Sequence, residues 1–284
     1  MKNNKSFKIY GVLGYPVKHS LSPIMHNAAL RRLKIKAEYR LFEKSPREVR
    51  SFLRSLGQEN IHGLNVTVPH KENVIKFLDS VSMEARLIGA VNTVQVKSNR
   101  LLGFNTDGAG FIKHLTCDLK FNPRKKNVVV IGAGGAAKAI TVYLARTGAR
   151  QISIFDIDKN KLSQLVTHLR NNFPKIKFNQ SGSINESGID DCDLLINATP
   201  MGMKPQDKLP ADVKLIRPGT LVYDLVYNPK ETKFLKNAKK RHARVANGLG
   251  MLLYQGALSF KIFTGKNAPL GVMRRALNRG VSKL

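Results

Sequence analysis

The chain of 284 residues has room for two domains, and its 42% hydrophobic and 24% charged residues are typical of a soluble globular protein. Its 48 Lys and Arg against 19 Asp and Glu give a net charge of +29, but they are spread along the chain without interleaved aromatic residues, so we expect attraction of anionic ligands and no specific nucleic-acid binding. The absence of a long apolar run, a signal peptide, a disulfide framework and a Cys/His metal motif predicts a cytoplasmic protein with no membrane contact and no metal.

The first predicted elements are a strand over residues 8–13 and a helix that begins after a short loop. Ser22 is typical of a helix N-cap, and Pro23 of a first helical residue. Capping gives Ser22 a structural explanation, whereas Ser20 in the same loop has none.

A strand over residues 39–42 and a helix over 46–56 precede a strand with one polar face. In residues 61–68, apolar side chains alternate with Asn65 and Thr67. One face of this strand is therefore apolar, and the other presents an amide and a hydroxyl.

Lys71 lies in the turn that leads from this strand into a helix over residues 72–78, and by position alone it is an ordinary surface lysine. Residues 89–96 and 101–104 then form a predicted β-hairpin whose second strand delivers Asn105, Thr106 and Asp107. Polar residues thus collect at strand ends beside glycine, which indicates one side of a binding cleft.

A strand–helix–strand unit follows, with an apolar strand over residues 128–131, an Ala-rich helix over 136–146 and a second strand over 152–155. Short apolar strands joined by a helix are typical of a buried parallel sheet. This unit contains the strongest local motif in the chain.

The glycines of this unit predict a dinucleotide site. Gly132 suits the tight turn after the strand, Gly134 allows the backbone to approach a pyrophosphate, and Ala137 lets the helix pack close. The helix N-terminus offers its free amides to the phosphates. At the end of the second strand, Asp156 is placed to accept hydrogen bonds from the adenosine ribose.

Three further strands, over residues 193–197, 221–224 and 243–247, each break into a loop, and two helices without later strands close the chain. The predicted fold class is α/β with two domains. An N-terminal α/β domain over residues 1–107 is completed by residues 249–284, and a Rossmann-type, doubly wound dinucleotide-binding domain spans 108–248.

Several motifs, in order along nearly the whole chain, resemble those of the shikimate dehydrogenase family. They are Gly14-x-Pro16-x-x-His19-Ser20-x-Ser22-Pro23-x-x-His26-Asn27, Asn65-Val-Thr67-Val-Pro69-x-Lys71, Gly89-Ala-Val-Asn92-Thr93, Asn105-Thr106-Asp107, Asn197-Ala-Thr199-Pro200-Met-Gly202, Asp224-x-x-Tyr227 and Gly248-Leu-Gly250-Met251-Leu-x-x-Gln255-Gly256.

This resemblance implies reversible reduction of 3-dehydroshikimate to shikimate by hydride from a nicotinamide, in aromatic amino acid (chorismate) biosynthesis. It assigns Lys71 and Asp107 as the catalytic pair of the first, substrate-binding domain. It places substrate contacts at Ser20, Ser22, Asn65, Thr67, Asn92, Tyr227 and Gln255. It places cofactor contacts at Gly132, Ala133, Gly134, Gly135, Ala136, Asp156, Asp158, Ala198, Thr199, Leu225 and Gly248.

The chain departs from the family pattern at the end of the second nucleotide-domain strand. Many family members that use NADP carry Asn-Arg-Thr there, whereas this chain has Asp156, Ile157 and Asp158. Because a carboxylate favours free ribose hydroxyls and repels a 2′-phosphate, we expect NAD(H) as the preferred cofactor, with NADP(H) as the alternative. Lys159 and Lys161 soften that repulsion.

Two other functions stay open at this point. A quinate/shikimate dehydrogenase that uses NAD is the first alternative, and a non-catalytic ligand-sensing relative is a remote second. We expect a monomer or homodimer whose partner is the small-molecule substrate.

Overall fold

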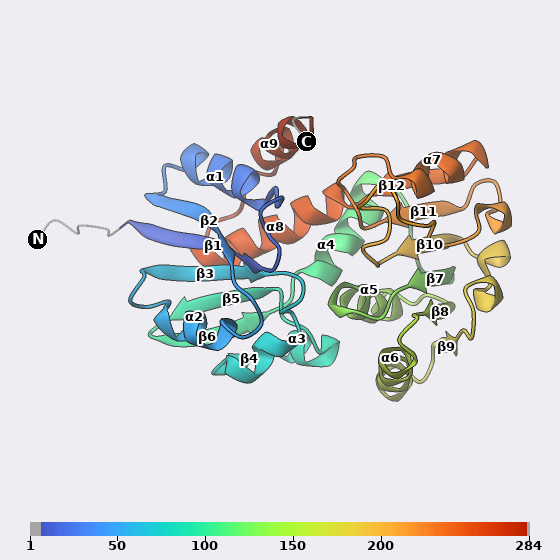
Figure 1. Ribbon diagram of the computed structural model, residues 1–284, viewed down its shortest axis with the longest axis horizontal. Coiled ribbons are helices and arrows are strands. Elements are labelled where there is room, and N and C mark those ends of the chain that lie inside the picture. The colour runs from blue at the N-terminus through green and yellow to red at the C-terminus, as the bar shows by residue number, and fades with distance from the viewer. Residues whose placement is uncertain (1–6, 283–284) are drawn as a thin grey trace, which may run out of the picture. The chain divides into compact units, whose positions relative to one another are not determined.

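The computed structural model describes residues 7–282, which divide into two compact units. Unit 1 takes the chain up to Gly110 and again from Leu252, and unit 2 takes Phe111–Met251. Unit 2 is therefore inserted into the sequence of unit 1. Figure 1 traces both units by colour, from the blue N-terminal strands to the red C-terminal helices.

Unit 1 is built on a mixed six-stranded sheet in the order β2-β1-β3-β5-β6-β4. Its strands are β1 (Lys8–Gly14), β2 (Ala37–Glu43), β3 (Ile61–Val66), β4 (Ser80–Val81), β5 (Thr93–Lys97) and β6 (Arg100–Phe104). Strand β1 pairs in parallel with β2 and β3, whereas β5 is antiparallel to both of its neighbours. The β5–β6 connection is a two-residue turn in which Ser98 and Asn99 both have positive φ, as the predicted hairpin requires.

Helices cover both faces of this sheet. They are α1 (Ser22–Arg32), α2 (Val49–Ser55), α3 (Met83–Ile88), α4 (Asp107–Lys113, shared with unit 2), α8 (Leu249–Thr264) and α9 (Leu270–Val281), with a 3₁₀ helix over Asn73–Phe77. Side chains alternate along β1, so Leu13 and Tyr10 lie on opposite faces of the sheet. Leu13 belongs to the core that contains Phe52 of α2, whereas Tyr10 stacks on Phe263 of α8. Two apolar cores thus lie on opposite faces of one sheet.

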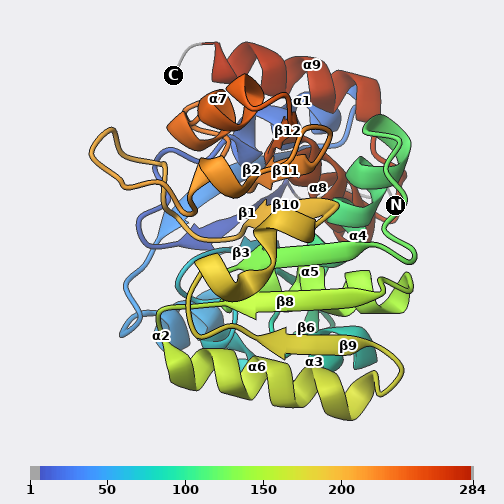
Figure 2. The same cartoon turned by 90° about the vertical axis from the view of Figure 1, so that its right-hand side faces the viewer.

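Unit 2 contains a fully parallel sheet in the order β12-β11-β10-β7-β8-β9. Its strands are β7 (Asn127–Ile131), β8 (Gln151–Phe155), β9 (Lys177–Gln180), β10 (Leu194–Asn197), β11 (Leu221–Asp224) and β12 (Arg244–Asn247). The helices are α5 (Gly135–Arg146), α6 (Lys159–Asn172) and α7 (Lys233–Lys240). This is the strand order of a Rossmann-type fold. Figure 2 shows β8 and β9 running side by side above α6. The predicted fold class is confirmed.

Some local structure was not predicted. Strand β4 has two residues and helix α3 has six, and a π-helical turn over His114–Asp118 continues α4. The segment predicted as a helix over residues 72–78 is the 3₁₀ helix Asn73–Phe77. The predicted N-cap is one residue out: α1 begins at Ser22, its N-cap is Leu21, and no side chain caps it. The Ser22 side chain instead hydrogen-bonds to Tyr39, and Ser20 Oγ accepts from the Ser22 amide at 3.2 Å.

Candidate active site

Lys71 and Asp107 form a short ion pair within unit 1. Lys71 Nζ donates to Asp107 Oδ2 at 2.6 Å, and the two side chains are only 15% and 5% exposed. Asp107 opens α4, and its amide is held by Asn105 Oδ1 at 3.0 Å. Charge-assisted hydrogen bonds of this kind are stronger than neutral ones when water is largely excluded. The pair therefore holds an oriented ammonium beside a carboxylate.

Asn92 fixes the other oxygen of the Asp107 carboxylate. Its Nδ2 donates to Asp107 Oδ1 at 2.8 Å and to Thr106 Oγ1 at 2.9 Å, and reaches Gln255 Oε1 at 3.3 Å. The amide cannot turn over, because Asn92 Oδ1 accepts from the Thr106 amide at 2.8 Å. Asp107 is thus held by a cation on one oxygen and by an amide on the other.

Asn65 is tied into the same network from β3. Its Nδ2 donates to the Asn92 carbonyl and to Thr93 Oγ1, both at 3.2 Å, and its Oδ1 accepts from the Tyr39 hydroxyl at 2.8 Å. Ser259 of α8 also donates to Oδ1, at 3.3 Å. Asn65 is 6% exposed, and both ends of its amide are engaged by protein groups.

Gln255 reaches the network because α4 and α8 approach each other closely. A Cβ placed on Gly110 would lie 2.5 Å from the Gln255 amide nitrogen, so only glycine fits there. Gln255 Nε2 donates to the Leu252 carbonyl at 2.8 Å, which leaves its Oε1 directed at Asn92. A close contact between two helices thus places this side chain.

The remaining predicted substrate residues are not all joined by this network. Ser22 is buried and Ser20 half-buried in the loop before α1. Thr67 is half-buried after β3, and its amide donates to the Leu13 carbonyl at 2.8 Å. Tyr227 is a half-buried residue of unit 2. Unit 1 therefore brings together Lys71, Asp107, Asn92, Asn65 and Gln255, with Ser22 linked to Asn65 through Tyr39.

Tyr39, Thr93 and Ser259 take part in the network but were not predicted as site residues. Tyr39 lies in the middle of β2, 2% exposed, where a tyrosine is indistinguishable in sequence from an ordinary core residue. His26, one helical turn after Ser22, stacks on its ring with centroids 4.2 Å apart and planes 7° apart. His26 belongs to the first family motif, whereas Tyr39 carries no sequence signal of its own.

In unit 2 the predicted glycine turn is present at the end of β7. Gly132 has φ +113°, a conformation that favours glycine, and a Cβ there would lie 3.1 Å from the Ala198 carbonyl oxygen. Gly134 is the N-cap of α5, faces open space and provides no side-chain cap to the helix. The first turn of α5, with Gly135 and Ala136, therefore has amides that no capping side chain takes, which suits a phosphate group.

Asp156 is hydrogen-bonded to backbone amides of two loops. Its Oδ2 accepts from the Ala133 amide at 2.6 Å and its Oδ1 from the Asp158 amide at 2.8 Å. Asp158 in turn caps α6, accepting from the amides of Asn160 and Lys161 at 3.1 Å each. Asp156 thus joins the loops that follow β7 and β8, and Asp158 caps α6.

The other predicted cofactor residues follow strands at the same carboxyl edge. Thr199 Oγ1 donates to Asn197 Oδ1 at 2.6 Å, and the Leu225 amide donates to the Asn197 carbonyl at 2.9 Å. Gly248 follows β12, where a Cβ would lie 2.0 Å from the Leu225 carbonyl oxygen. In doubly wound folds this edge is where nucleotides bind.

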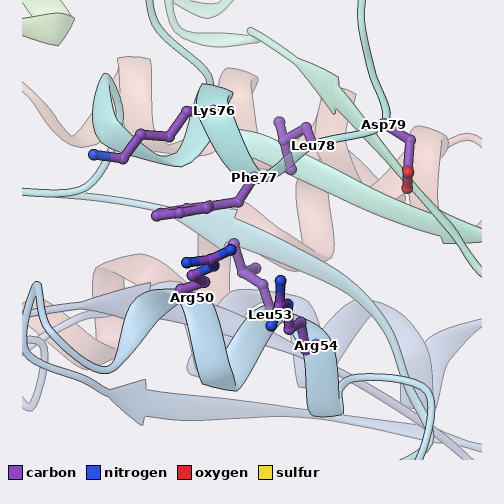
Figure 3. A pocket seen from close by; sticks show the side chains of 7 residues that line it. All are labelled: Arg50, Leu53, Arg54, Lys76, Phe77, Leu78 and Asp79. Atoms are coloured by element: carbon purple, nitrogen blue, oxygen red, sulfur yellow. The ribbon is translucent and has the colours of Figure 1, made fainter.

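A hollow of unit 1 lies away from these residues. It has a volume of about 260 Å³ and lies between α2 and the 3₁₀ helix (Figure 3). Its lining residues are Arg50, Leu53, Arg54, Lys76, Phe77, Leu78 and Asp79. None of them belongs to the network around Asp107.

Within residues 7–282, no group of three or more His, Cys, Asp or Glu residues is arranged to hold a metal ion. None of the described helices combines the length and the apolar character needed to cross a membrane.

Three family models match the chain. They are the shikimate dehydrogenase substrate binding domain over residues 12–94, shikimate / quinate 5-dehydrogenase over 117–203, and the shikimate 5'-dehydrogenase C-terminal domain over 248–277.

Curated relatives match over nearly their whole length. The shikimate dehydrogenase (NADP(+)) of Desulforamulus reducens is 41% identical over 284 residues, which covers 99% of this chain and 98% of the relative. That of Geobacillus kaustophilus is 44% identical, with 91% and 93% covered.

Solved structures agree in fold. A shikimate dehydrogenase in complex with NADP+ has a TM-score of 0.89 and 37% identity, with 98% of this chain and 97% of that chain covered. Shikimate 5-dehydrogenase from Listeria monocytogenes, in complex with shikimate and NAD, has a TM-score of 0.86 and 32% identity, with 98% of both chains covered.

The expected preference for NAD(H) is wrong. Both curated relatives are named as NADP(+) enzymes, and the first of the two structures contains NADP+. The physical reason lies in Asp156: backbone amides of Ala133 and Asp158 each donate to one of its oxygens and offset part of its negative charge, so an acid at this position does not by itself select NAD. The quinate alternative is not favoured by relatives named for shikimate.

Proposed function

The chain belongs to the shikimate dehydrogenase family, and we propose that Lys71 and Asp107 perform its chemistry. The enzyme is an oxidoreductase that interconverts 3-dehydroshikimate and shikimate with a nicotinamide cofactor. The observation that supports the proposal is the 2.6 Å contact between Lys71 Nζ and Asp107 Oδ2, in a pair that is almost wholly buried.

The proposed roles follow from where charge develops. When bound, the nicotinamide supplies or accepts the hydride at the carbon that carries the reacting oxygen. Negative charge then grows on that oxygen during reduction, and the Lys71 ammonium stabilises it and donates a proton. Asp107 keeps the ammonium oriented, and Asn92 keeps Asp107 in place.

The polar groups around this pair suit a hydroxylated ring acid. The hydroxyls of Ser20 and Ser22 are proposed to bind the substrate carboxylate. The substrate hydroxyls are proposed to contact Asn65, Thr67, Asn92, Tyr227 and Gln255. Because Asn65 and Asn92 are fully hydrogen-bonded within the protein, substrate contact requires exchange of their weaker bonds, such as the 3.3 Å contact between Asn92 and Gln255. A site of this kind rejects analogues that lack a hydroxyl.

We propose NADP(H) as the cofactor, bound by residues of the predicted domain 108–248. The open Gly134 turn and the uncapped start of α5 suit the pyrophosphate. The 2′-phosphate has two cations nearby in sequence, Lys159 and Lys161, at the start of α6. Asp156 would contribute by holding the loop and not by direct contact.

Steady-state kinetics of the purified protein test both proposals. We expect reduction of 3-dehydroshikimate, with NADPH a better reductant than NADH and quinate a poorer substrate than shikimate in the reverse direction. Lys71→Ala should lower kcat by roughly 10²–10⁴-fold with a modest change in KM, because it removes the proton donor and leaves the binding groups in place.

The matched control is Lys76→Ala. Lys76 is an exposed lysine on the 3₁₀ helix that follows Lys71, and it is expected to keep wild-type kinetics. Turnover of Lys71→Ala close to that of Lys76→Ala would contradict the assignment of the proton donor.

A further inference from the structure

The hydroxyl of Tyr39 connects two parts of the site that are far apart in sequence. Ser22, proposed to bind the substrate carboxylate, hydrogen-bonds to Tyr39. Tyr39 Oη donates to Asn65 Oδ1 at 2.8 Å. A phenol has one proton, which Tyr39 gives to Asn65. The Ser22 hydroxyl also has one proton, which the substrate carboxylate requires once it is bound, so the lasting chain of hydrogen bonds begins at Tyr39.

From Asn65 the hydrogen bonds continue to the catalytic pair. Asn65 Nδ2 donates to Thr93 Oγ1 at 3.2 Å, and Thr93 Oγ1 donates to Asn92 Oδ1 at 2.9 Å. Asn92 Nδ2 then donates to Asp107 Oδ1 at 2.8 Å. Every bond from Tyr39 onward points the same way and ends on the carboxylate that holds Lys71.

A chain of hydrogen bonds with one direction is cooperative, since each donor is polarised by the bond it accepts. Burial strengthens the effect: Ser22, Tyr39, Asn65, Thr93 and Asn92 are all 6% exposed or less. The negative terminus on Asp107 makes this direction the favourable one, because all the donors point toward the charge.

The position of Tyr39 is itself firmly set. Its ring stacks on His26, whose imidazole is 1% exposed, and burial raises the pKa of the phenol well above its ordinary value. The hydroxyl thus stays protonated and continues to donate to Asn65.

We propose that Tyr39 is a positioning residue of the active site, which orients Asn65 and, through Thr93 and Asn92, supports Asp107. The proposal rests on the function proposed above. Tyr39 itself touches none of the reacting groups. It fixes the amide orientation of Asn65.

The chain offers a matched control in Tyr10. Tyr10 is the register partner of Tyr39 across the β1–β2 pair, is 3% exposed and stacks on Phe263. Its hydroxyl donates to the Phe263 carbonyl at 3.3 Å, which takes it out of the network. Tyr39→Phe and Tyr10→Phe therefore each remove one buried hydroxyl from neighbouring strands.

The experiment compares the kinetics of these two variants. Tyr39→Phe should lower kcat/KM for shikimate roughly three- to tenfold, the range expected for one buried hydrogen bond, with the KM for the cofactor unchanged. Tyr10→Phe should stay within about twofold of wild type, even though both variants lose a similar amount of thermal stability. Equal kcat/KM in the two variants would overturn the proposal.

A double-mutant cycle with Asn65→Ala adds a readout that stability does not affect. If Tyr39 acts through Asn65, the loss of kcat/KM caused by Tyr39→Phe should be smaller in the Asn65→Ala background than in wild type. Fully additive losses would also overturn the proposal.

A third measurement separates this proposal from the proposed function. Side-chain amide protons of Asn65 and Asn92, observed by NMR, should exchange with solvent faster in Tyr39→Phe than in Tyr10→Phe, whether or not the protein turns over shikimate. Wild-type protein that does not oxidise shikimate would refute the function, whereas identical amide exchange in the two variants would refute the role of Tyr39.

Discussion

His26 is a buried imidazole. Its ring stacks on Tyr39 and on Phe260, it is 1% exposed, and among residues 7–282 its Nε2 has no hydrogen-bond partner. Desolvation by burial lowers the pKa of its imidazole from 6.5 to about 3. The folded protein therefore contains the neutral ring under all ordinary conditions, as stacking on Tyr39 requires.

This burial predicts a loss of stability in acid. Below pH 6.5 the unfolded chain takes up a proton that folded His26 refuses, so the free energy of unfolding falls as pH falls from 6.5 toward 3. At pH 5 the loss is about 2 kcal/mol. His26→Phe keeps a stacking ring without a titrating group, and denaturant unfolding should show a shallower pH dependence for this variant. The same slope as wild type would mean that His26 is protonated in the folded state.

Asp156 illustrates how far a single residue can be interpreted from sequence. An acid at the end of the second strand indicates a free carboxylate that selects NAD, and the NAD(H) preference expected from it was wrong here. The sequence does not reveal that the amides of Ala133 and Asp158 converge on its two oxygens. Whether a polar side chain is free or already paired is decided by backbone groups from other loops.

At the scale of elements, the contact between α4 and α8 links packing to catalysis. Helix α4 begins with Asp107 and α8 contains Gln255, and the helices touch where Gly110 meets the Gln255 backbone. Any side chain on Gly110 must push the two helices apart. The catalytic carboxylate and a proposed substrate group would then move together.

Gly110→Ala should therefore cost about 1–3 kcal/mol of stability by overpacking, and it should also lower kcat/KM. Gly271→Ala is the control, because that glycine is an exposed residue of α9 where the nearest atom to a Cβ is Arg275 Nη1 at 3.6 Å. This variant should gain about 0.5–1 kcal/mol and keep full activity. Thermal unfolding and kinetics of both variants test this prediction. Wild-type stability and kcat/KM in Gly110→Ala would show that α4 can shift without destabilising the protein.

Sequence periodicity predicted most elements of both sheets, because buried parallel strands such as β7 and β10 are continuous apolar runs. It did not predict β4, because a strand of two residues is too short to show a periodic pattern. It also did not predict α3, although Ser82 and Gly89 are ordinary capping signals for a helix. The Lys71–Asp107 pair was predicted only from the family resemblance. Nothing local links these residues, and their contact depends on the sheet that brings β3 and β6 to one end.

For the whole molecule, the net charge of +29 predicts a kinetic effect of salt. Shikimate and the cofactor are anions, so the field of the protein should raise their rate of encounter. We expect kcat/KM to fall roughly tenfold as KCl rises from about 0.01 M to about 1 M, with kcat at saturation nearly constant. A kcat/KM that does not change with salt would show that the charge is too evenly spread to steer these ligands.

The inserted arrangement of the units has a consequence for synthesis on the ribosome. Unit 2 is one continuous stretch and can fold as soon as it has emerged, whereas unit 1 must wait for the segment that begins at Leu252. That last segment brings Gln255, and it also brings Ser259 and Phe263, which contact Asn65 and Tyr10. In a nascent chain, unit 2 can thus fold before the active site is complete. Premature termination near the C-terminus would therefore yield a catalytically inactive product in which unit 2 is folded.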